Sequence, residues 1–195
     1  MADRLGRAAA GLVVMAALLA GACSGDDGGE ADEDDGPLTT LAPTPATVPE
    51  VPAASAAGTG MLVIGRSTHA VTVTDCTLTP DPAAPEGARA LLVISGTGTT
   101  EAGVGFTVEV QRFATSLNEV VTYTDTIAYT DAARILQAQR VEVAGQITDL
   151  RDPDASSALL RPRADGVSGA GLAGPPGGDA EEGGLVGVAL DLTCG

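Results

Sequence analysis

The chain has 195 residues, of which 44% are hydrophobic but only 2% are aromatic, and its formal net charge is −16. Such an acidic surface repels nucleic-acid phosphates, and so few rings give no stacking platform for single strands, so nucleic acid is excluded as a partner. All ten basic residues are Arg, and the lack of Lys excludes P-loop, Schiff-base and Ser-Lys mechanisms.

The N-terminal segment has the pattern of an export signal. Arg4 and Arg7 form a short positive stretch, and residues 8–20 form an apolar run. This run is shorter than the roughly 20 residues of a typical membrane-spanning helix, but its length is typical of the apolar part of a signal peptide. We therefore expect residues 1–22 to be a signal peptide.

Cys23 directly follows the small residues Ala20, Gly21 and Ala22. This pattern resembles the lipobox of bacterial lipoproteins, in which the Cys is lipidated and becomes the new N-terminus, although Ala20 stands where Leu is usual. We expect a covalent diacylglycerol on Cys23 as the only cofactor, with the protein on the extracytoplasmic face of the cell membrane. Two acyl chains, at about 0.8 kcal/mol per buried CH₂, anchor a protein stably. The alternative is an ordinary secretory signal cleaved nearby.

Residues 23–60 have the composition of a disordered tether. Seven carboxylates are crowded into positions 26–35, and Pro, Thr and Ala dominate the stretch that follows. Such a segment has little apolar surface to bury, and both charge repulsion and Pro extend it. The acidic run lacks the ligand spacing of a calcium loop, so we interpret it as solvated charge. The folded domain is predicted at residues 61–195.

Short alternating apolar runs predict an all-β domain from residue 61 onward. Residues 106–113 alternate most clearly, with Phe106, Val108 and Val110 on one face. Turn-forming Gly, Pro and Asp separate the runs, which favours an antiparallel sandwich or open meander of about seven to eight strands. The predicted strands are residues 61–64, 70–74, 89–95, 106–113, 119–127, 139–147 and 185–194.

Three segments do not follow the strand pattern. Residues 132–139 (AARILQAQ) are predicted as one or two helical turns. The glycines of residues 166–171 are interpreted as hairpin and loop glycines, and residues 171–184 as a mobile loop.

The three cysteines are an odd number, which lipidation explains. If Cys23 carries the lipid, Cys76 and Cys194 remain as a pair in a compartment where disulfides persist. We therefore predict a Cys76–Cys194 disulfide. Cys76 has the opposite parity to the apolar residues of the strand before it, so we expect a bulge at Asp75 or the end of the strand there.

No catalytic or metal-binding constellation can be identified. His69 is the only histidine, so one chain cannot form a zinc or copper site with two or three imidazoles. It stands at the start of a strand, where a surface or turn histidine is expected, and no G-x-S-x-G or G-x-G-x-x-G motif accompanies it. Paired acids of a glycosidase would lack aromatic sugar platforms. We expect no enzymatic activity and no metal site.

The layout as a whole resembles the mycobacterial 19 kDa lipoprotein antigen (LpqH-like) family, which are small surface lipoproteins of actinobacteria. The resemblance covers most of residues 1–195, while residues 132–160 and the loop near residue 175 depart from it. It implies a surface antigen or interaction protein without catalytic residues. The features that carry it are Cys23, the acidic tether, Val63-Ile64-Gly65, Val73-Thr74-Asp75-Cys76 and Leu192-Thr193-Cys194-Gly195.

We expect a membrane-anchored, non-catalytic module that acts in interaction or structure at the cell envelope, because a long tether lets a domain reach other surface components. Its partners would be the membrane, through the anchor, and an envelope or host protein or a glycolipid; we expect a monomer. The alternative is a carrier of a lipid or other apolar ligand, since small apolar side chains between curved sheets can leave a cavity. A filled core without a ligand-sized pocket would exclude this alternative.

Overall fold

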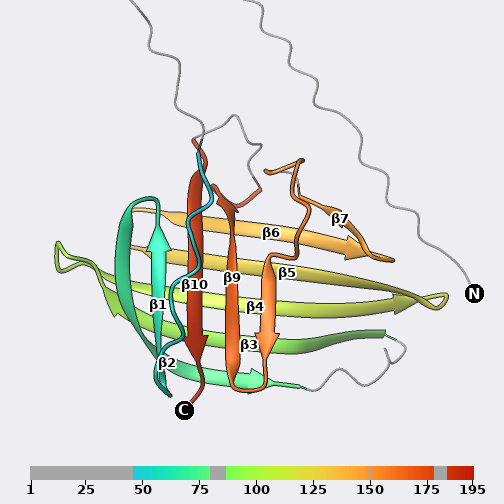
Figure 1. The fold of residues 1–195 in the computed structure, drawn as a ribbon, viewed down its shortest axis with the longest axis horizontal. Coiled ribbons are helices and arrows are strands. Elements are labelled where there is room, and N and C mark those ends of the chain that lie inside the picture. The colour runs from blue at the N-terminus through green and yellow to red at the C-terminus, as the bar shows by residue number, and fades with distance from the viewer. Residues whose placement is uncertain (1–45, 80–86, 150, 178–183) are drawn as a thin grey trace, which may run out of the picture. The chain divides into compact units, whose positions relative to one another are not determined.

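The computed structural model describes residues 46–79, 87–149, 151–177 and 184–195 (Figure 1). The predicted signal peptide and Cys23 lie outside these ranges. The all-β, antiparallel prediction is confirmed, with more strands than expected, and within the described ranges no helix is long and apolar enough to cross a bilayer. The strands are β1 (Thr59–Ile64), β2 (Ser67–Leu78), β3 (Gly87–Thr99), β4 (Gly105–Leu117), β5 (Val120–Asp131), β6 (Ile135–Val143), β7 (Gln146–Thr148), β8 (Leu160–Arg163), β9 (Gly166–Ala173) and β10 (Val186–Thr193).

The strands form one antiparallel sheet in the order β7-β6-β5-β4-β3-β2-β1-β10-β9-β8. The sheet curls, so that β1 and β8–β10 cross over β3–β6 at a steep angle (Figure 1). An isolated bridge between Gln137 of β6 and Gly174, which follows β9, joins the two layers. The apolar core therefore lies inside a half-barrel.

β2 carries the chain from one layer to the other. Its first half pairs with β1 and its second half with β3, and the register shifts between Val73 and Asp75. Such a bulge bends a strand and increases its twist. This confirms the predicted interruption next to Asp75. It also gives Cys76 a position from which it forms the predicted disulfide with Cys194, with Cα atoms 5.9 Å apart.

The inward faces of the strands are apolar. Phe106, Val108 and Val110 of β4 are at most 4% exposed, which confirms the predicted alternation. The prediction of a surface histidine is wrong: His69 is 8% exposed, and its ring centroid lies 5.5 Å from that of Phe106. His69 shares the inward face of β2 with Val71, so the strand's alternation continues through it.

Two secondary-structure predictions for residues 132–147 are also wrong. Residues 132–139, predicted as helical turns, form the turn after β5 and the start of β6, because pairing along β5 overrides their local helix propensity. The predicted strand 139–147 is divided between β6 and β7, with a tight turn at Ala144 and Gly145, where φ is positive.

The glycine-rich residues 166–173 form β9, which pairs with both β8 and β10, instead of a loop. A Cβ atom at Gly166 would lie 2.1 Å from the carbonyl oxygen of Leu192. Glycine is therefore needed here for close approach of neighbouring backbones, and a glycine-rich sequence can still form a central strand.

The described fold begins earlier than the predicted boundary at residue 61. Residues 46–58 run along β10, where the Ser55 backbone N–H donates to Asp191 Oδ1 at 3.1 Å. Gly187 leaves room for this segment, since a Cβ atom there would lie 2.0 Å from the Thr47 carbonyl oxygen. Part of the segment assigned to the tether thus covers the outer face of β10.

Candidate functional site

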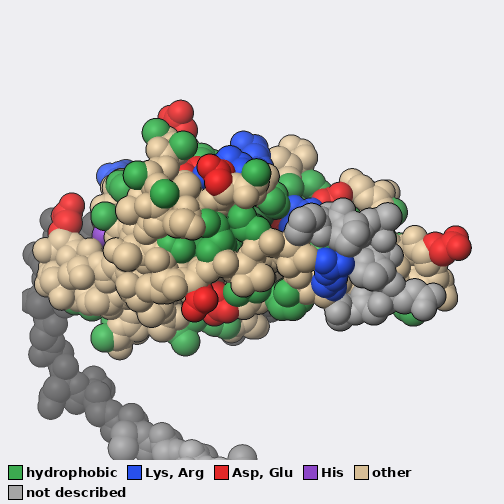
Figure 2. Space-filling view, turned by 90° about the horizontal axis from the view of Figure 1, so that it is seen from below, with side chains coloured by type: hydrophobic (Ala, Val, Ile, Leu, Met, Phe, Trp, Pro, Cys, Tyr) green, Lys and Arg blue, Asp and Glu red, His purple; other side chains and the backbone are tan. Residues whose placement is uncertain are grey.

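A pocket of about 660 Å³ opens at one end of the half-barrel, between the β8–β9 turn and strands β2–β5. Its volume falls within the roughly 300–1,000 Å³ of ordinary ligand sites. Figure 2 shows a central depression with hydrophobic side chains on this side of the molecule. The described lining residues are Leu78, Thr79, Leu91, Leu92, Arg112, Tyr123, Pro162, Arg163 and Ala164.

A second bulge supplies much of the apolar wall. The register between β3 and β4 shifts between Ala90 and Leu92. In a regular strand, Leu91 and Leu92 would point to opposite faces. Because of the bulge, both side chains line the pocket, and both are buried, with 7% and 2% of their surface exposed.

Arg112 extends from the inward face of β4 into the wall of the pocket. Its guanidinium carbon lies 4.7 Å from the centre of the Tyr123 ring, a distance at which a cation–π interaction holds it in place. Its Nε atom is 3.6 Å from Asp125 Oδ1, and its Nη2 atom is 3.8 Å from Glu142 Oε2. A cation therefore lies at the apolar surface of the pocket, with two carboxylates beside it.

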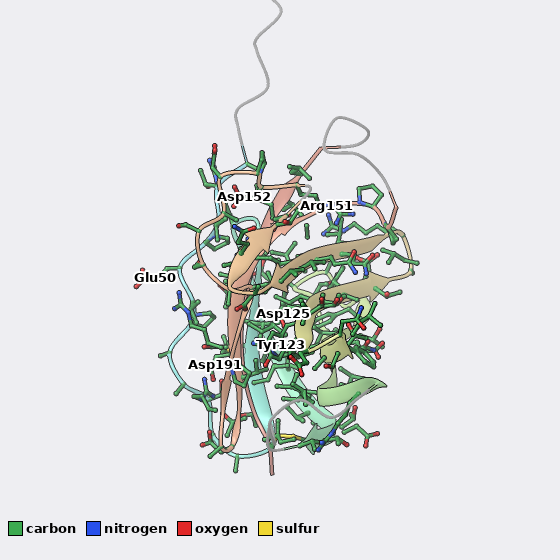
Figure 3. The ribbon with its side chains drawn as sticks, turned by 90° about the vertical axis from the view of Figure 1, so that its right-hand side faces the viewer. Glu50, Tyr123, Asp125, Arg151, Asp152 and Asp191 are labelled. Carbon is green, nitrogen blue, oxygen red and sulfur yellow. A yellow bond between two sulfur atoms is a disulfide. The ribbon has the colours of Figure 1, made fainter. Side chains whose placement is uncertain are left out.

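Asp125 of β5 is the direct cross-strand neighbour of Arg112 and lies on the same face of β5 as Tyr123 (Figure 3). It is 5% exposed, and its Oδ2 atom accepts a hydrogen bond from the Leu160 backbone N–H at 3.2 Å. Burial raises the pKa of Asp125 to about 6, while the Arg112 charge and the Leu160 N–H act in the opposite direction. Across the sheet, Arg112, Asp125 and Arg140 are direct neighbours in register.

Replacing Asp125 by Asn is expected to stabilise the domain at pH 8 but not at pH 4. The folded-state pKa of about 6 exceeds the ordinary 3.8, so the folded chain holds this proton more tightly, and native stability falls as pH rises from about 4 to 6. At 1.36 kcal/mol per unit, the gain at pH 8 is about 1–3 kcal/mol. Asn keeps an oxygen that accepts from Leu160.

Urea unfolding at both pH values measures this gain. Asp154→Asn, at an exposed position, is the matched control and should show little difference between the two pH values. An Asp125→Asn variant less stable than the wild type at pH 8 would contradict the assignment of a desolvated carboxylate.

A buried ion pair lies next to this row. Arg140 Nη2 and Asp149 Oδ2 are 2.9 Å apart, with 4% and 1% of their side chains exposed. Arg140 also donates to the Ser157 carbonyl oxygen, and Asp149 Oδ1 accepts from the N–H groups of Arg151 and Asp152. The pair thus fastens the connection between β7 and β8 to the inner face of β6.

Arg163 has a different environment from Arg112, although both line the pocket. Its Nη1 and Nη2 atoms lie 2.5 and 3.2 Å from the two carboxylate oxygens of Asp191, which is 2% exposed. This hydrogen bonding raises the pKa of Arg163 above its usual value. We conclude that Arg163 fastens β8 to β10.

The structure brings Cys76 and Cys194 together, and neither is among the described residues that line the pocket. Among the described residues, no group of three His, Cys, Asp or Glu side chains is placed to hold a metal ion. Arg112, Tyr123 and Asp125 were not identified from the sequence. In a sequence, polar residues in a half-buried strand are normally assigned to the solvent-exposed face. Only the cross-strand register shows that these three side chains point inward.

Comparison with protein-family models, with curated proteins and with solved structures finds no match for this chain. The resemblance to the mycobacterial lipoprotein family stays a prediction from the sequence.

Proposed function

We propose that this chain is a lipid-anchored protein of the cell envelope whose β-domain carries a small apolar or amphipathic ligand in the pocket at the open end of the half-barrel. The observation that carries the proposal is the pocket itself, about 660 Å³ with walls of Leu78, Leu91 and Leu92. A pocket of this kind, mostly apolar with a few convergent polar groups, is the usual form of a small-molecule site.

The pocket changes the order of the two functional hypotheses. The sequence favoured an interaction module over a carrier, and a core without a ligand-sized pocket would have excluded the carrier. The predicted signal peptide and the lipid on Cys23 would hold the domain at the membrane, where lipid-like ligands are available.

The test uses the mature chain, residues 23–195, exported with Cys23→Ser so that it carries no acyl group of its own. Native mass spectrometry of the purified protein should show a fraction with one additional small molecule. Ala164→Trp, a substitution at an exposed residue lining the pocket, should abolish this fraction.

Ala133→Trp is the matched control, because Ala133 is exposed in the β5–β6 turn and does not line the pocket. It should leave the bound fraction unchanged. A bare mass for the Cys23→Ser chain without a further substitution, together with no binding of added amphiphiles, would contradict a carrier.

The second candidate is an interaction module at the cell envelope, the function expected from the sequence. The observation that favours it is a group of exposed apolar residues near one end of β4–β6: Leu117, Val120 and Val143 are 75%, 46% and 39% exposed. A photo-crosslinking residue at position 117 in cells should then capture an envelope component, whereas the same residue at the exposed position 161 should not. Equal labelling at both positions would argue against it.

A further inference from the structure

We infer that the pocket takes a single-chain amphiphile with an anionic head group, a carboxylate or a phosphate, which binds beside Arg112 while the chain lies against the leucine wall. This inference rests on the proposed function and specifies its ligand.

The described lining of the pocket contains arginine but no carboxylate, unlike the chain as a whole. The protein carries 26 Asp and Glu residues against ten Arg. Yet the nine described residues that line the pocket include two of these Arg and no Asp or Glu. A positive group inside an apolar depression of an acidic molecule focuses its field on an entering anion. Charge complementarity therefore favours an anionic ligand over a neutral or cationic one.

Arg112 is the arginine in position to bind the head group. Arg163 lies within 3.2 Å of both carboxylate oxygens of Asp191. In contrast, the carboxylates beside Arg112 stand 3.6 and 3.8 Å away, beyond the usual N–H···O distance. A guanidinium lying over a ring still has N–H donors at its edge, in a fork that matches carboxylate and phosphate oxygens.

The charged groups that face Arg112 come from the two neighbouring strands, β5 and β6. Asp125 on β5 and Glu142 on β6 face it from the side, and Arg140 on β6 faces Asp125 in turn. Because burial raises the pKa of Asp125 to about 6, this carboxyl compensates the Arg112 charge incompletely at mildly acidic pH. Arg112 is itself 15% exposed.

The remainder of the pocket is suited to a hydrocarbon chain. Leu78 of β2, Leu91 and Leu92 of β3, and Pro162 of β8 give apolar walls on two sides. A volume of about 660 Å³ is that of a site for one small ligand. We therefore infer one chain instead of a lipid with several chains.

Isothermal titration calorimetry on the mature chain with Cys23→Ser tests this inference at pH 6 and low salt, near the pKa of Asp125, where this carboxyl compensates the Arg112 charge incompletely. The probes are laurate, dodecyl phosphate and the uncharged 1-dodecanol, which share a twelve-carbon chain and are used at submicellar concentrations. Acetate and inorganic phosphate supply the head groups alone. Laurate and dodecyl phosphate should bind at least tenfold more tightly than dodecanol, and the two small anions should not bind measurably.

Arg112→Gln should remove this preference, with the affinity for dodecanol changing less than twofold. Arg161→Gln, which removes an exposed arginine of the same strand as Pro162, is the matched control and should bind all probes as the wild type does. If Arg112→Gln unfolds, Arg112→Gln/Asp125→Asn removes the buried carboxylate at the same time and should show the same loss.

The outcomes separate the two proposals. Equal binding of dodecanol and laurate, unaffected by Arg112→Gln, would overturn the anionic head group and leave the carrier function standing. Binding of inorganic phosphate as tight as that of dodecyl phosphate would overturn the amphiphile and indicate a simple anion site. No binding of any twelve-carbon probe would overturn both proposals.

Discussion

Loss of the Cys76–Cys194 disulfide is expected to lower the free energy of unfolding by about 4–5 kcal/mol. The bond joins residues separated by 118 positions, and in the chain-entropy model a loop of this length constrains the unfolded chain strongly. It links the second half of β2 to the residue after β10. The loss would be a large fraction of a typical stability of about 5–15 kcal/mol.

Urea unfolding of the wild type and of Cys76→Ser/Cys194→Ser, with and without reductant, measures this contribution. The control is internal, since reductant should destabilise the wild type and leave the double variant unchanged. A wild type that loses less than about 1 kcal/mol on reduction would contradict the chain-entropy account and show that the reduced, unfolded chain retains structure across this loop.

Asp149→Ala is expected to destabilise the domain by about 3–5 kcal/mol, because it leaves the Arg140 charge buried without its closest partner. The carboxylate also accepts the N–H groups of Arg151 and Asp152, so its loss removes the hydrogen bonds that shape the connection after β7. Chemical unfolding at pH 7 measures the effect.

The double variant Arg140→Met/Asp149→Leu should lower the free energy of unfolding by less than Asp149→Ala alone. Removal of both charges leaves no buried charge uncompensated. The comparison at the surface is Arg134→Ala, which breaks a pair whose arginine is 51% exposed and should cost at most about 1 kcal/mol. If Asp149→Ala cost no more than Arg134→Ala, the buried pair would not fasten this part of the chain.

The fold class could be predicted because strands with one buried face show alternating apolar and polar residues in the sequence. The alternation through Phe106, Val108 and Val110 predicts β4 and its inward face correctly. The parity of Cys76 predicts the bulge in β2 and, with the cysteine count, the disulfide.

The errors arose where local composition conflicts with sheet pairing. Ala and Gln residues before and within β6 favour a helix locally, yet pairing with β5 makes this segment a strand. β9 is rich in glycine because its neighbours approach closely at Gly166. Local pattern alone contains neither effect, because both depend on residues distant in the sequence.

The inner face of the sheet next to the pocket could not be predicted because charged residues form part of it. Arg140 is flanked by Gln139 and Val141, and the alternating apolar residues there belong to the outer face, whereas Arg140 itself is 4% exposed. The bulge that turns both Leu91 and Leu92 toward the pocket depends on the register between β3 and β4. These features appear only when the strands are aligned.

The most direct test of a ligand-carrying pocket is methyl NMR of the mature Cys23→Ser chain during titration with laurate. We predict that the methyl resonances of Leu78, Leu91 and Leu92 shift in a saturable way, whereas those of the fully buried core residues Leu62 and Leu190 change little. Shifts confined to Leu117 and Val120 on the exposed end of the β4–β5 hairpin, or no saturable shifts at all, would contradict the proposed function.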